Sequence, residues 1–255
     1  MKIVSLSPSV TEILFAIGVG GEIVANTSYC DYPEESKKIP KLGSFTYIDD
    51  EKIKSLKPDL VISSTVVQND AKVRYKNFTH IHLDPRSLSD IYDSIILLGQ
   101  ATNHLSEAQN VVHIMKRTQR SIRNTQYSHK SKVYIEEWFD PPMASGNWVP
   151  DIVRLAGGIY FPGIKKDDIS RAVTKLEIQA FNPDVIFISY CGYKDKSNQN
   201  EILKRLHWQN ISAVKNKKVF VLNDDLLNRP GPRVLEAVIE MRRFLIDPIL
   251  TDLIV

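Results

Sequence analysis

The sequence predicts an α/β protein made of two doubly wound α/β lobes that are joined by one long helix. Two observations support this fold class. Short apolar strands alternate with amphipathic helices along both halves of the chain, which is typical of parallel sheets covered by helices on both faces. Residues 51–64 and 177–189 also share one pattern, in which an acidic helix start is followed by apolar helix positions, Pro-Asp and a buried strand. This pattern indicates an internal duplication.

The N-terminal lobe is expected to span residues 1–103 and begins with a strand over residues 3–6. Ser7-Pro8-Ser9 followed by Glu12 has the S-x-x-E spacing of a capping box, which predicts a helix that ends before Gly18. The later elements, in order, are strand 23–25, helix 49–56, strand 60–62, strand 80–83 and a helix that ends near Gly99.

The linking helix is expected within residues 104–128. Its apolar residues recur at helical spacing and its basic residues lie elsewhere on the surface, so one amphipathic helix is predicted. The apolar positions are Leu105, Ala108, Val112, Met115 and Ile122. The basic residues near its end complement the negative pole of the helix dipole and need no anionic partner.

The C-terminal lobe is expected to span residues 129–255 and repeats the alternation. The predicted elements are strand 132–135, helix 149–155, a short helix near Leu176, strand 185–188, helix 200–206, strand 218–222 and helix 233–245. Ligands of doubly wound sheets bind outside the carboxyl ends of the strands. Two such lobes are therefore expected to form a ligand cleft between them.

Composition excludes several classes of protein. The chain has 255 residues, 43% of them hydrophobic and 25% charged, which is typical of a globular protein. A net charge of +3 is too small for a dedicated nucleic-acid binder. No apolar run approaches the ~18 residues of a membrane span, and polar residues interrupt the N-terminal segment where a signal peptide would be apolar. Cys30 and Cys191 are expected to be free thiols.

Motifs for nucleotide, hydrolase and metalloprotease chemistry are absent from the sequence. His80 and His82 would face the same side of a strand, but that strand holds no further ligand residue, so we expect ordinary packing and no metal site. No catalytic residue is predicted.

The loops that follow the strands are rich in aromatic residues, which suits a large and mostly apolar ligand. About half of these residues could instead be core. The set is Tyr29, Tyr32, Phe45, Tyr47, Trp138, Phe139, Trp148, Tyr190 and Tyr193. Asp224, Asp225 and Arg229 lie in a loop rich in Gly and Pro, where they could orient a ligand or pin the loop through a salt bridge.

A series of motifs resembles the vitamin B12 (cobalamin) binding proteins, which are substrate-binding components of ABC importers with a rigid helical linker. The motifs run in family order over nearly the whole chain. They are VSLSPSVTEILFAIG, SYCDYP, KIPKLGSF, IDDEKIKSLKPDLVI, DPPMASGNWVPDIVRLAGG, FNPDVIFIS and NRPGPRVLEAVIEM. The resemblance implies two α/β lobes joined by one long rigid helix, with the corrinoid held between them and no protein metal ligand.

The resemblance also implies a function and a set of site residues. The protein would be a monomeric, non-enzymatic carrier without a catalytic cofactor, which binds cobalamin or a related corrinoid and delivers it to the membrane subunits of an ABC transporter. The expected ligand-binding residues are Ser9, Tyr29, Phe45, Met143, Asp225 and Arg229 from the family motifs, with Trp138 and Trp148 from the aromatic set.

Docking on the transporter is expected to use one acidic residue on each lobe. Glu51 matches the family position, seven residues before Pro58, whereas the position seven residues before Pro183 holds Leu176. Glu177 follows one residue later. Since one residue turns a helical side chain by ~100°, we expect weaker docking through the second lobe.

Three questions remain open from the sequence. The family is exported or lipid-anchored, so an extracytoplasmic location is expected, while the missing leader leaves open a shortened chain or a cytoplasmic relative. A siderophore or haem carrier is the alternative ligand class, for which the loops offer mainly Arg86 and Arg229. A cytoplasmic corrinoid-related enzyme on the same scaffold would need an acid and base pair from Glu137, Asp224 and Asp225.

Overall fold

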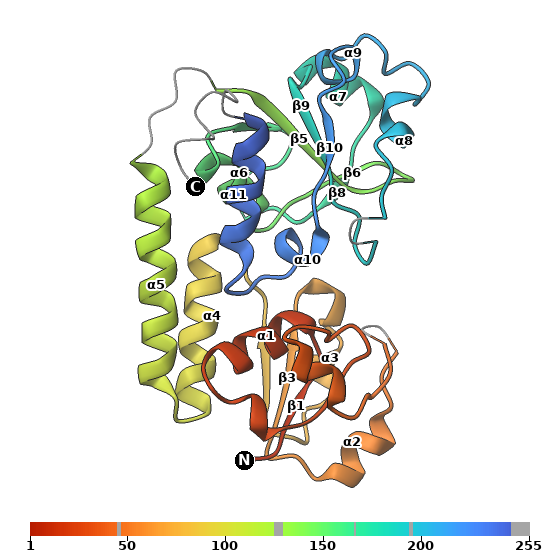
Figure 1. Ribbon diagram of the computed structural model, residues 1–255. Coiled ribbons are helices and arrows are strands. Elements are labelled where there is room, and N and C mark those ends of the chain that lie inside the picture. Colours follow the sequence, from red (N-terminus) through yellow and green to blue (C-terminus); the bar gives the residue numbers. More distant parts are fainter. Residues whose placement is uncertain (45–46, 125–129, 166, 194–195, 246–255) are drawn as a thin grey trace. The chain divides into compact units, whose positions relative to one another are not determined.

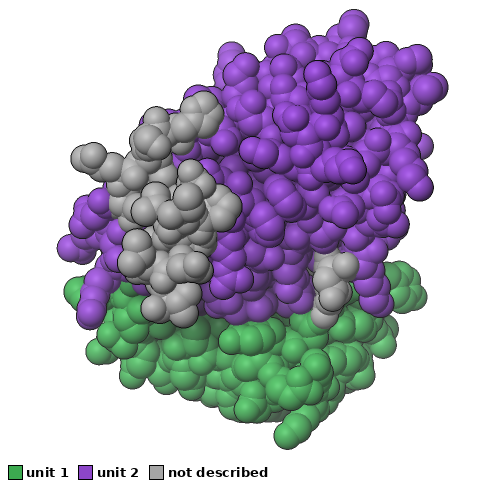
Figure 2. Space-filling model, turned by 45° about the horizontal axis from the view of Figure 1, so that its top comes forward, with its two compact units in different colours: residues 1–85, 89–116 green, residues 86–88, 117–255 purple. Residues whose placement is uncertain are grey.

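The computed structural model describes residues 1–44, 47–124, 130–165, 167–193 and 196–245. The chain divides into two compact units, coloured separately in Figure 2. Unit 1 consists of residues 1–85 and 89–116, and unit 2 consists of residues 86–88 and 117–255. Each unit contains its own sheet with parallel strands and its own helices (Figure 1). The predicted α/β fold class is therefore confirmed.

Unit 1 contains a parallel four-stranded sheet in the order β2-β1-β3-β4. The strands are β1 (Ile3–Ser5), β2 (Ile23–Asn26), β3 (Leu60–Ser64) and β4 (His80–Leu83). Every residue of β1 and β3 is buried. The two central strands are therefore covered on both faces, which explains why the sequence shows them as continuous apolar runs.

Helices in unit 1 alternate with its strands, and all but one of them are predicted from the sequence. They are α1 (Pro8–Ala16), α2 (Asp50–Leu56), α3 (Ala71–Arg74) and most of α4 (Leu88–Ala101), with short 3₁₀ turns at Gly20–Glu22, Glu34–Lys38 and Val66–Gln68. Helix α1 packs against β1 and β3. The helix α3 was not predicted, because a single turn of four residues carries no periodic signal.

The predicted capping box at Ser9 and Glu12 is wrong. Helix α1 begins at Pro8, so its N-cap is Ser7, whose side chain makes no capping hydrogen bond. Proline fits the first helical position because its missing N–H needs no partner there. Ser9 therefore lies inside the first turn, where its hydroxyl is 2.9 Å from the hydroxyl of Ser7.

The linking helix is α5 (Leu105–Arg123), which begins in unit 1 and ends in unit 2. Its predicted residues 125–128 lie outside the described residues. Four of its five predicted apolar positions are buried, whereas Leu105 is 37% exposed. In unit 1, α5 lies beside α4 (Figure 1), and a side chain at Gly99 of α4 would collide with Ala108 of α5.

Unit 2 contains a sheet in the order β10-β9-β5-β6-β8, with β7 also paired to β5. The strands are β5 (Lys132–Trp138), β6 (Met143–Ala144), β7 (Ile159–Tyr160), β8 (Arg171–Ala172), β9 (Val185–Ile188) and β10 (Val219–Val221). The pairs β10–β9, β9–β5 and β5–β7 are parallel, whereas β5–β6 and β6–β8 are antiparallel. The two-residue strands β6, β7 and β8 are too short for the sequence pattern to predict.

Helices in unit 2 surround this sheet. They are α6 (Val149–Leu155), α7 (Lys175–Phe181), α8 (Asn200–Leu203), α9 (Ser212–Lys215), α10 (Asp224–Leu227) and α11 (Val234–Leu245). Helix α11 packs against α6 and α10. The buried Arg242 of α11 donates a hydrogen bond of 3.0 Å to the carbonyl of Ile122, which fixes the end of α5 to unit 2. Within the described residues, no helix is long and apolar enough to span a membrane.

A histidine pair lies on the edge strand β4 of unit 1. His80 Nε2 and His82 Nδ1 are each 2.8 Å from the hydroxyl of Ser63 on β3. Burial lowers the pKa of both imidazoles, and the positive charge of Lys72 adds to this effect. In the part of the chain that the structure describes, no group of three or more His, Cys, Asp or Glu side chains is arranged to hold a metal ion.

The histidine pair predicts a pH dependence of stability. Because the folded pKa of each imidazole lies below the unfolded value of about 6.5, the unfolded chain takes up protons first as the pH falls. The free energy of unfolding should therefore fall between pH 7.5 and about 5.5, more steeply in the parent than in a His80→Gln/His82→Gln variant. Urea unfolding measures this, with exposed His113→Gln as the control. Equal slopes in the parent and the double variant would contradict it.

Candidate functional site

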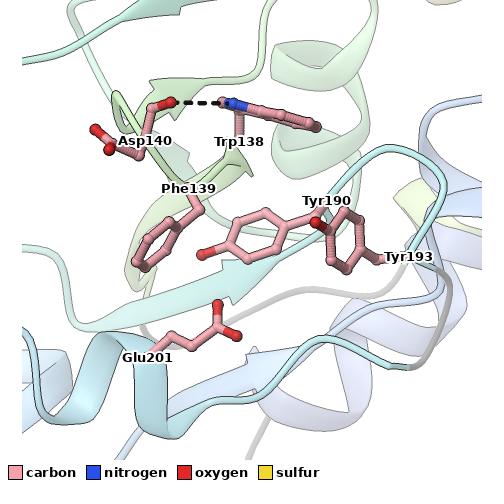
Figure 3. Close-up of a pocket in the computed structure, with 6 residues that line it drawn as sticks. All are labelled: Trp138, Phe139, Asp140, Tyr190, Tyr193 and Glu201. Atoms are coloured by element: carbon pink, nitrogen blue, oxygen red, sulfur yellow. Dashed lines mark hydrogen bonds between the residues drawn. The ribbon is translucent and has the colours of Figure 1, made fainter.

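An aromatic pocket lies in unit 2, at the carboxyl ends of β5 and β9 (Figure 3). Its volume is about 320 Å³. Two of its segments follow β5 and β9, which are parallel neighbours and therefore end at the same edge of the sheet. The third segment is α8. The residues that line the pocket are Trp138, Phe139, Asp140, Tyr190, Tyr193 and Glu201.

The four rings of the aromatic pocket contact one another edge to face. The ring centroids of Trp138 and Tyr193 are 6.4 Å apart, those of Tyr193 and Tyr190 are 6.0 Å apart, and those of Tyr190 and Phe139 are 6.4 Å apart. This geometry places the positive edge of one ring against the negative face of the next. Tyr190 is 2% exposed, whereas the other three rings are 42–50% exposed. The pocket therefore presents half-exposed apolar rings above a buried one.

Among the described residues, the charged side chains that line the pocket are both acidic. They are Asp140 and Glu201, and none of the described lining residues is basic. Within the described residues, neither carboxylate forms an ion pair, and Figure 3 shows the carboxylate of Glu201 directed toward the rings. A negative site lined by rings favours a neutral or cationic ligand over an anionic one.

A buried carboxylate, Glu136, lies behind the aromatic pocket with 0% of its side chain exposed. It accepts hydrogen bonds of 2.6 and 2.7 Å from the two terminal nitrogens of Arg205. The Tyr190 hydroxyl donates a third bond of 2.7 Å. Burial raises the pKa of the Glu136 carboxyl, and the bonds from Arg205 offset part of that rise. Burial likewise raises the pKa of Tyr190, so its hydroxyl stays a donor.

The predicted ligand-binding residues of unit 2 lie in different surroundings. Trp138 lines the aromatic pocket, and Met143 of β6 is half-buried. Trp148 is 5% exposed, and its indole N–H donates a hydrogen bond of 2.8 Å to the carbonyl of Leu227, so it packs inside the unit. Asp225 and Arg229 form an ion pair with each other. Of these five residues, only Trp138 is among those that line the pocket.

The predicted ligand-binding residues of unit 1 are Ser9, Tyr29 and Phe45. Ser9 is 2% exposed and lies in the first turn of α1. Tyr29 is 50% exposed. Phe45 lies outside the described residues.

The remaining acidic residues near the strand ends of unit 2 act as hydrogen-bond acceptors for neighbouring loops. Glu137 accepts a bond of 2.6 Å from the Ser170 hydroxyl, and Asp224 accepts one of 2.7 Å from the Gly192 amide. Burial raises the pKa of the Glu137 carboxyl. With Asp225 paired to Arg229, these carboxylates fix loops in place.

The two predicted docking carboxylates also differ. Glu51 of α2 is exposed, and among the described residues it bonds only to Lys54, at 2.6 Å, on the same helix. Glu177 of α7 accepts bonds from Arg171 and from both the amide and the hydroxyl of Thr174, which makes it the second residue of a capping box. The hydrogen bond from Arg171 and the one from the Thr174 amide together lower the pKa of the Glu177 carboxyl to about 2.

Sequence reasoning found the rings of the pocket but missed its polar residues. Phe139, Tyr190 and Tyr193 belong to the aromatic set, whereas Asp140, Glu201 and the Glu136–Arg205 pair were not predicted as parts of one site. One signal was available. The sequence predicts a strand that ends at residue 135, but β5 continues to Trp138. Side chains of a strand alternate between its two faces, so Tyr134 and Glu136 lie on the same face of β5. A carboxylate on a buried face requires hydrogen-bond partners, which indicates a polar contact at this position.

Comparisons with known proteins agree with this fold. The sequence model of the periplasmic binding protein family matches residues 3–226. The vitamin B12-binding protein of Vibrio cholerae serotype O1 is 30% identical over 96% of this chain and 88% of that protein. The uncharacterized ABC transporter substrate-binding lipoprotein YvrC of Bacillus subtilis is 33% identical over 94% of this chain and 78% of that protein.

Solved structures show the same fold. The periplasmic vitamin B12-binding protein BtuF of Vibrio cholerae has a TM-score of 0.75 at 27% identity, covering 95% of each chain. A possible iron-binding protein of Staphylococcus epidermidis has a TM-score of 0.80 at 27% identity, covering 95% of this chain and 97% of that one. The haem complex of IsdE from S. aureus has a TM-score of 0.85 at 23% identity, covering 96% and 99%, and shows the fold alone. The chain thus belongs to the periplasmic binding protein family, the substrate-binding proteins of ABC transporters.

Proposed function

We propose that this protein binds cobalamin or a closely related corrinoid and delivers it to the membrane subunits of an ABC transporter. The observation that carries the proposal is the aromatic pocket, whose described lining residues combine three half-exposed rings with two carboxylates and include no basic side chain. A corrinoid such as cobalamin offers a broad macrocycle edged by amide groups, which can pack on rings and needs no cationic partner. Several relatives named vitamin B12-binding protein support this choice.

Haem or a ferric siderophore is the alternative ligand, since solved relatives include haem-binding proteins and a possible iron-binding protein. Haem carries two propionate carboxylates. Next to Asp140 and Glu201 these would bring like charges together, and Arg229 is already paired with Asp225. The charge of the aromatic pocket therefore favours a corrinoid over an anionic ligand.

We further propose that the protein acts outside the cytoplasm, as a monomeric carrier. Trp138 and its pocket neighbours are the proposed ligand contacts in unit 2, and the half-exposed Tyr29 stays a proposed contact in unit 1. Met143, Asp225 and Arg229 stay proposed contacts from the family motifs. Trp148 and Ser9 are too buried to offer much surface to a ligand.

For transporter docking, we propose Glu51 as the acidic contact of unit 1. Its side chain is 83% exposed and its partner Lys54 lies on the same helix, so a basic residue of the transporter can reach it. Glu177 uses both carboxylate oxygens within unit 2. We therefore propose that Glu177 stabilises α7 and contributes little to docking.

Visible spectroscopy tests the proposed ligand. The protein is mixed separately with cyanocobalamin and with haemin, desalted, and its absorbance recorded. We expect retention of stoichiometric corrin absorbance with cyanocobalamin and weaker retention of haemin. In calorimetry, Trp138→Ala should weaken cyanocobalamin binding by about 1–3 kcal/mol through lost apolar contact, whereas Leu176→Ala, at a position 74% exposed on α7, should not change it. Stoichiometric retention of haemin without cyanocobalamin would reverse the ligand assignment.

Charge reversal tests the docking proposal in a reconstituted transporter. Glu51→Lys should lower the stimulation of transporter ATPase activity without changing cyanocobalamin affinity, because among the described residues Glu51 pairs only with Lys54 of its own helix and is not one of those that line the aromatic pocket. Glu177→Lys should lower the free energy of unfolding by about 1 kcal/mol through loss of the helix cap, with a smaller effect on stimulation. Stimulation that is unaffected by Glu51→Lys would rule out this docking contact.

A further inference from the structure

We propose that Arg205 and Glu136 are positioning residues for the aromatic pocket. Neither lines the pocket, yet together they hold Phe139 and Tyr190, two of its walls, in the orientation that receives a ligand. This inference rests on the proposed binding function and adds to it a pair of residues that act through others.

The first step is the anchoring of Tyr190. Its hydroxyl donates a hydrogen bond of 2.7 Å to Oε1 of Glu136, the same oxygen that accepts from Nη2 of Arg205. The other oxygen, Oε2, accepts from Nη1 of Arg205 and from the Tyr134 hydroxyl, the latter at 3.3 Å. A carboxylate that accepts four bonds has its orientation fixed, so the Tyr190 ring is held at its hydroxyl end as well as by its neighbouring rings.

The second step is the support of Phe139. The guanidinium carbon of Arg205 lies 5.1 Å from the centroid of the Phe139 ring and 4.5 Å from that of Trp208. Both distances are within the range of a cation–π contact. Phe139 follows the end of β5 and is 48% exposed, and the Arg205 guanidinium and the Tyr190 ring both contact its ring.

The third step is the convergence of chain segments on the pair. Glu136 belongs to β5, Tyr190 follows β9, and Arg205 follows α8, the helix that carries Glu201. The Arg205 side chain is 15% exposed and that of Glu136 is 0% exposed. Removing two charges from water is costly, and apolar residues of similar volume often replace such a pair without loss of stability. The planar guanidinium of Arg205, by contrast, makes hydrogen bonds of defined geometry that apolar residues cannot make. The main contribution of the pair is therefore to orient Phe139 and Tyr190.

The test compares the parent with a Glu136→Gln/Arg205→Met variant, which removes both charges at similar volume and leaves at position 136 an amide whose orientation Arg205 no longer fixes. Arg154→Met is the control, since Arg154 forms an exposed ion pair on α6 of the same unit. Crystal structures without ligand give the ring positions, urea unfolding gives stability, and calorimetry with cyanocobalamin gives affinity. We expect near-parental stability in the double variant, displaced Phe139 and Tyr190 rings, and about tenfold weaker binding. The control should match the parent throughout.

Three results would overturn the proposal: rings in the parental position, unchanged affinity, or a loss of affinity that only follows a loss of stability. If the double variant does not fold, Arg205→Lys decides the question in the same assays, because it keeps the charge but loses the fork and the stacking plane. If the parent itself does not bind cyanocobalamin, the proposed function fails. The ring positions in the variants then decide the positioning role by themselves.

Discussion

The carboxylate of Glu136 receives hydrogen bonds from each of the segments that shape the aromatic pocket. Tyr134 donates from within β5, Tyr190 from the segment after β9, and Arg205 from the segment after α8. A buried carboxylate without hydrogen-bond partners destabilises the fold. Moving these segments apart would therefore either expose Glu136 to water or leave its charge buried without a partner. The strand ends of unit 2 are thereby held together by one acceptor, and the half-exposed rings above it are fixed before any ligand arrives. Such preorganisation lowers the entropic cost of binding.

Unit 1 fixes its strand-end loops in a comparable way, but with a donor at the centre. The Lys41 ammonium donates to the side-chain oxygen of Asn26 and to the carbonyls of Cys30 and Ser36, at 2.7–3.0 Å. The loop that carries Tyr29 is therefore closed around one cation. Buried Gln68 bridges the ends of β1 and β3 through the Leu6 carbonyl and the Ser64 amide. In both units, polar side chains that are at least partly buried hold the loops that follow parallel strands, where ligands of this architecture bind.

The sequence predicts the main strands and the linking helix well, because buried strands and long amphipathic helices leave clear patterns. The two-residue strands β6–β8 leave none. The pocket was predictable in part: Trp138, Phe139 and Tyr190 follow apolar strands, so their place at the strand ends follows from the alternation. The Glu136–Arg205 contact joins residues 69 positions apart, and no local pattern links them. Trp148 belongs to the same aromatic set as Trp138, and only the folded chain shows that its indole reaches the carbonyl of Leu227.

A crystal structure of the protein with cyanocobalamin would test whether the aromatic pocket of unit 2 is a ligand-binding surface of this carrier. We expect a corrin ring in contact with the exposed faces of Trp138 and Tyr193, with its amide groups near Asp140 and Glu201. A corrinoid bound in full occupancy elsewhere on the protein, with these rings still facing solvent, would contradict it.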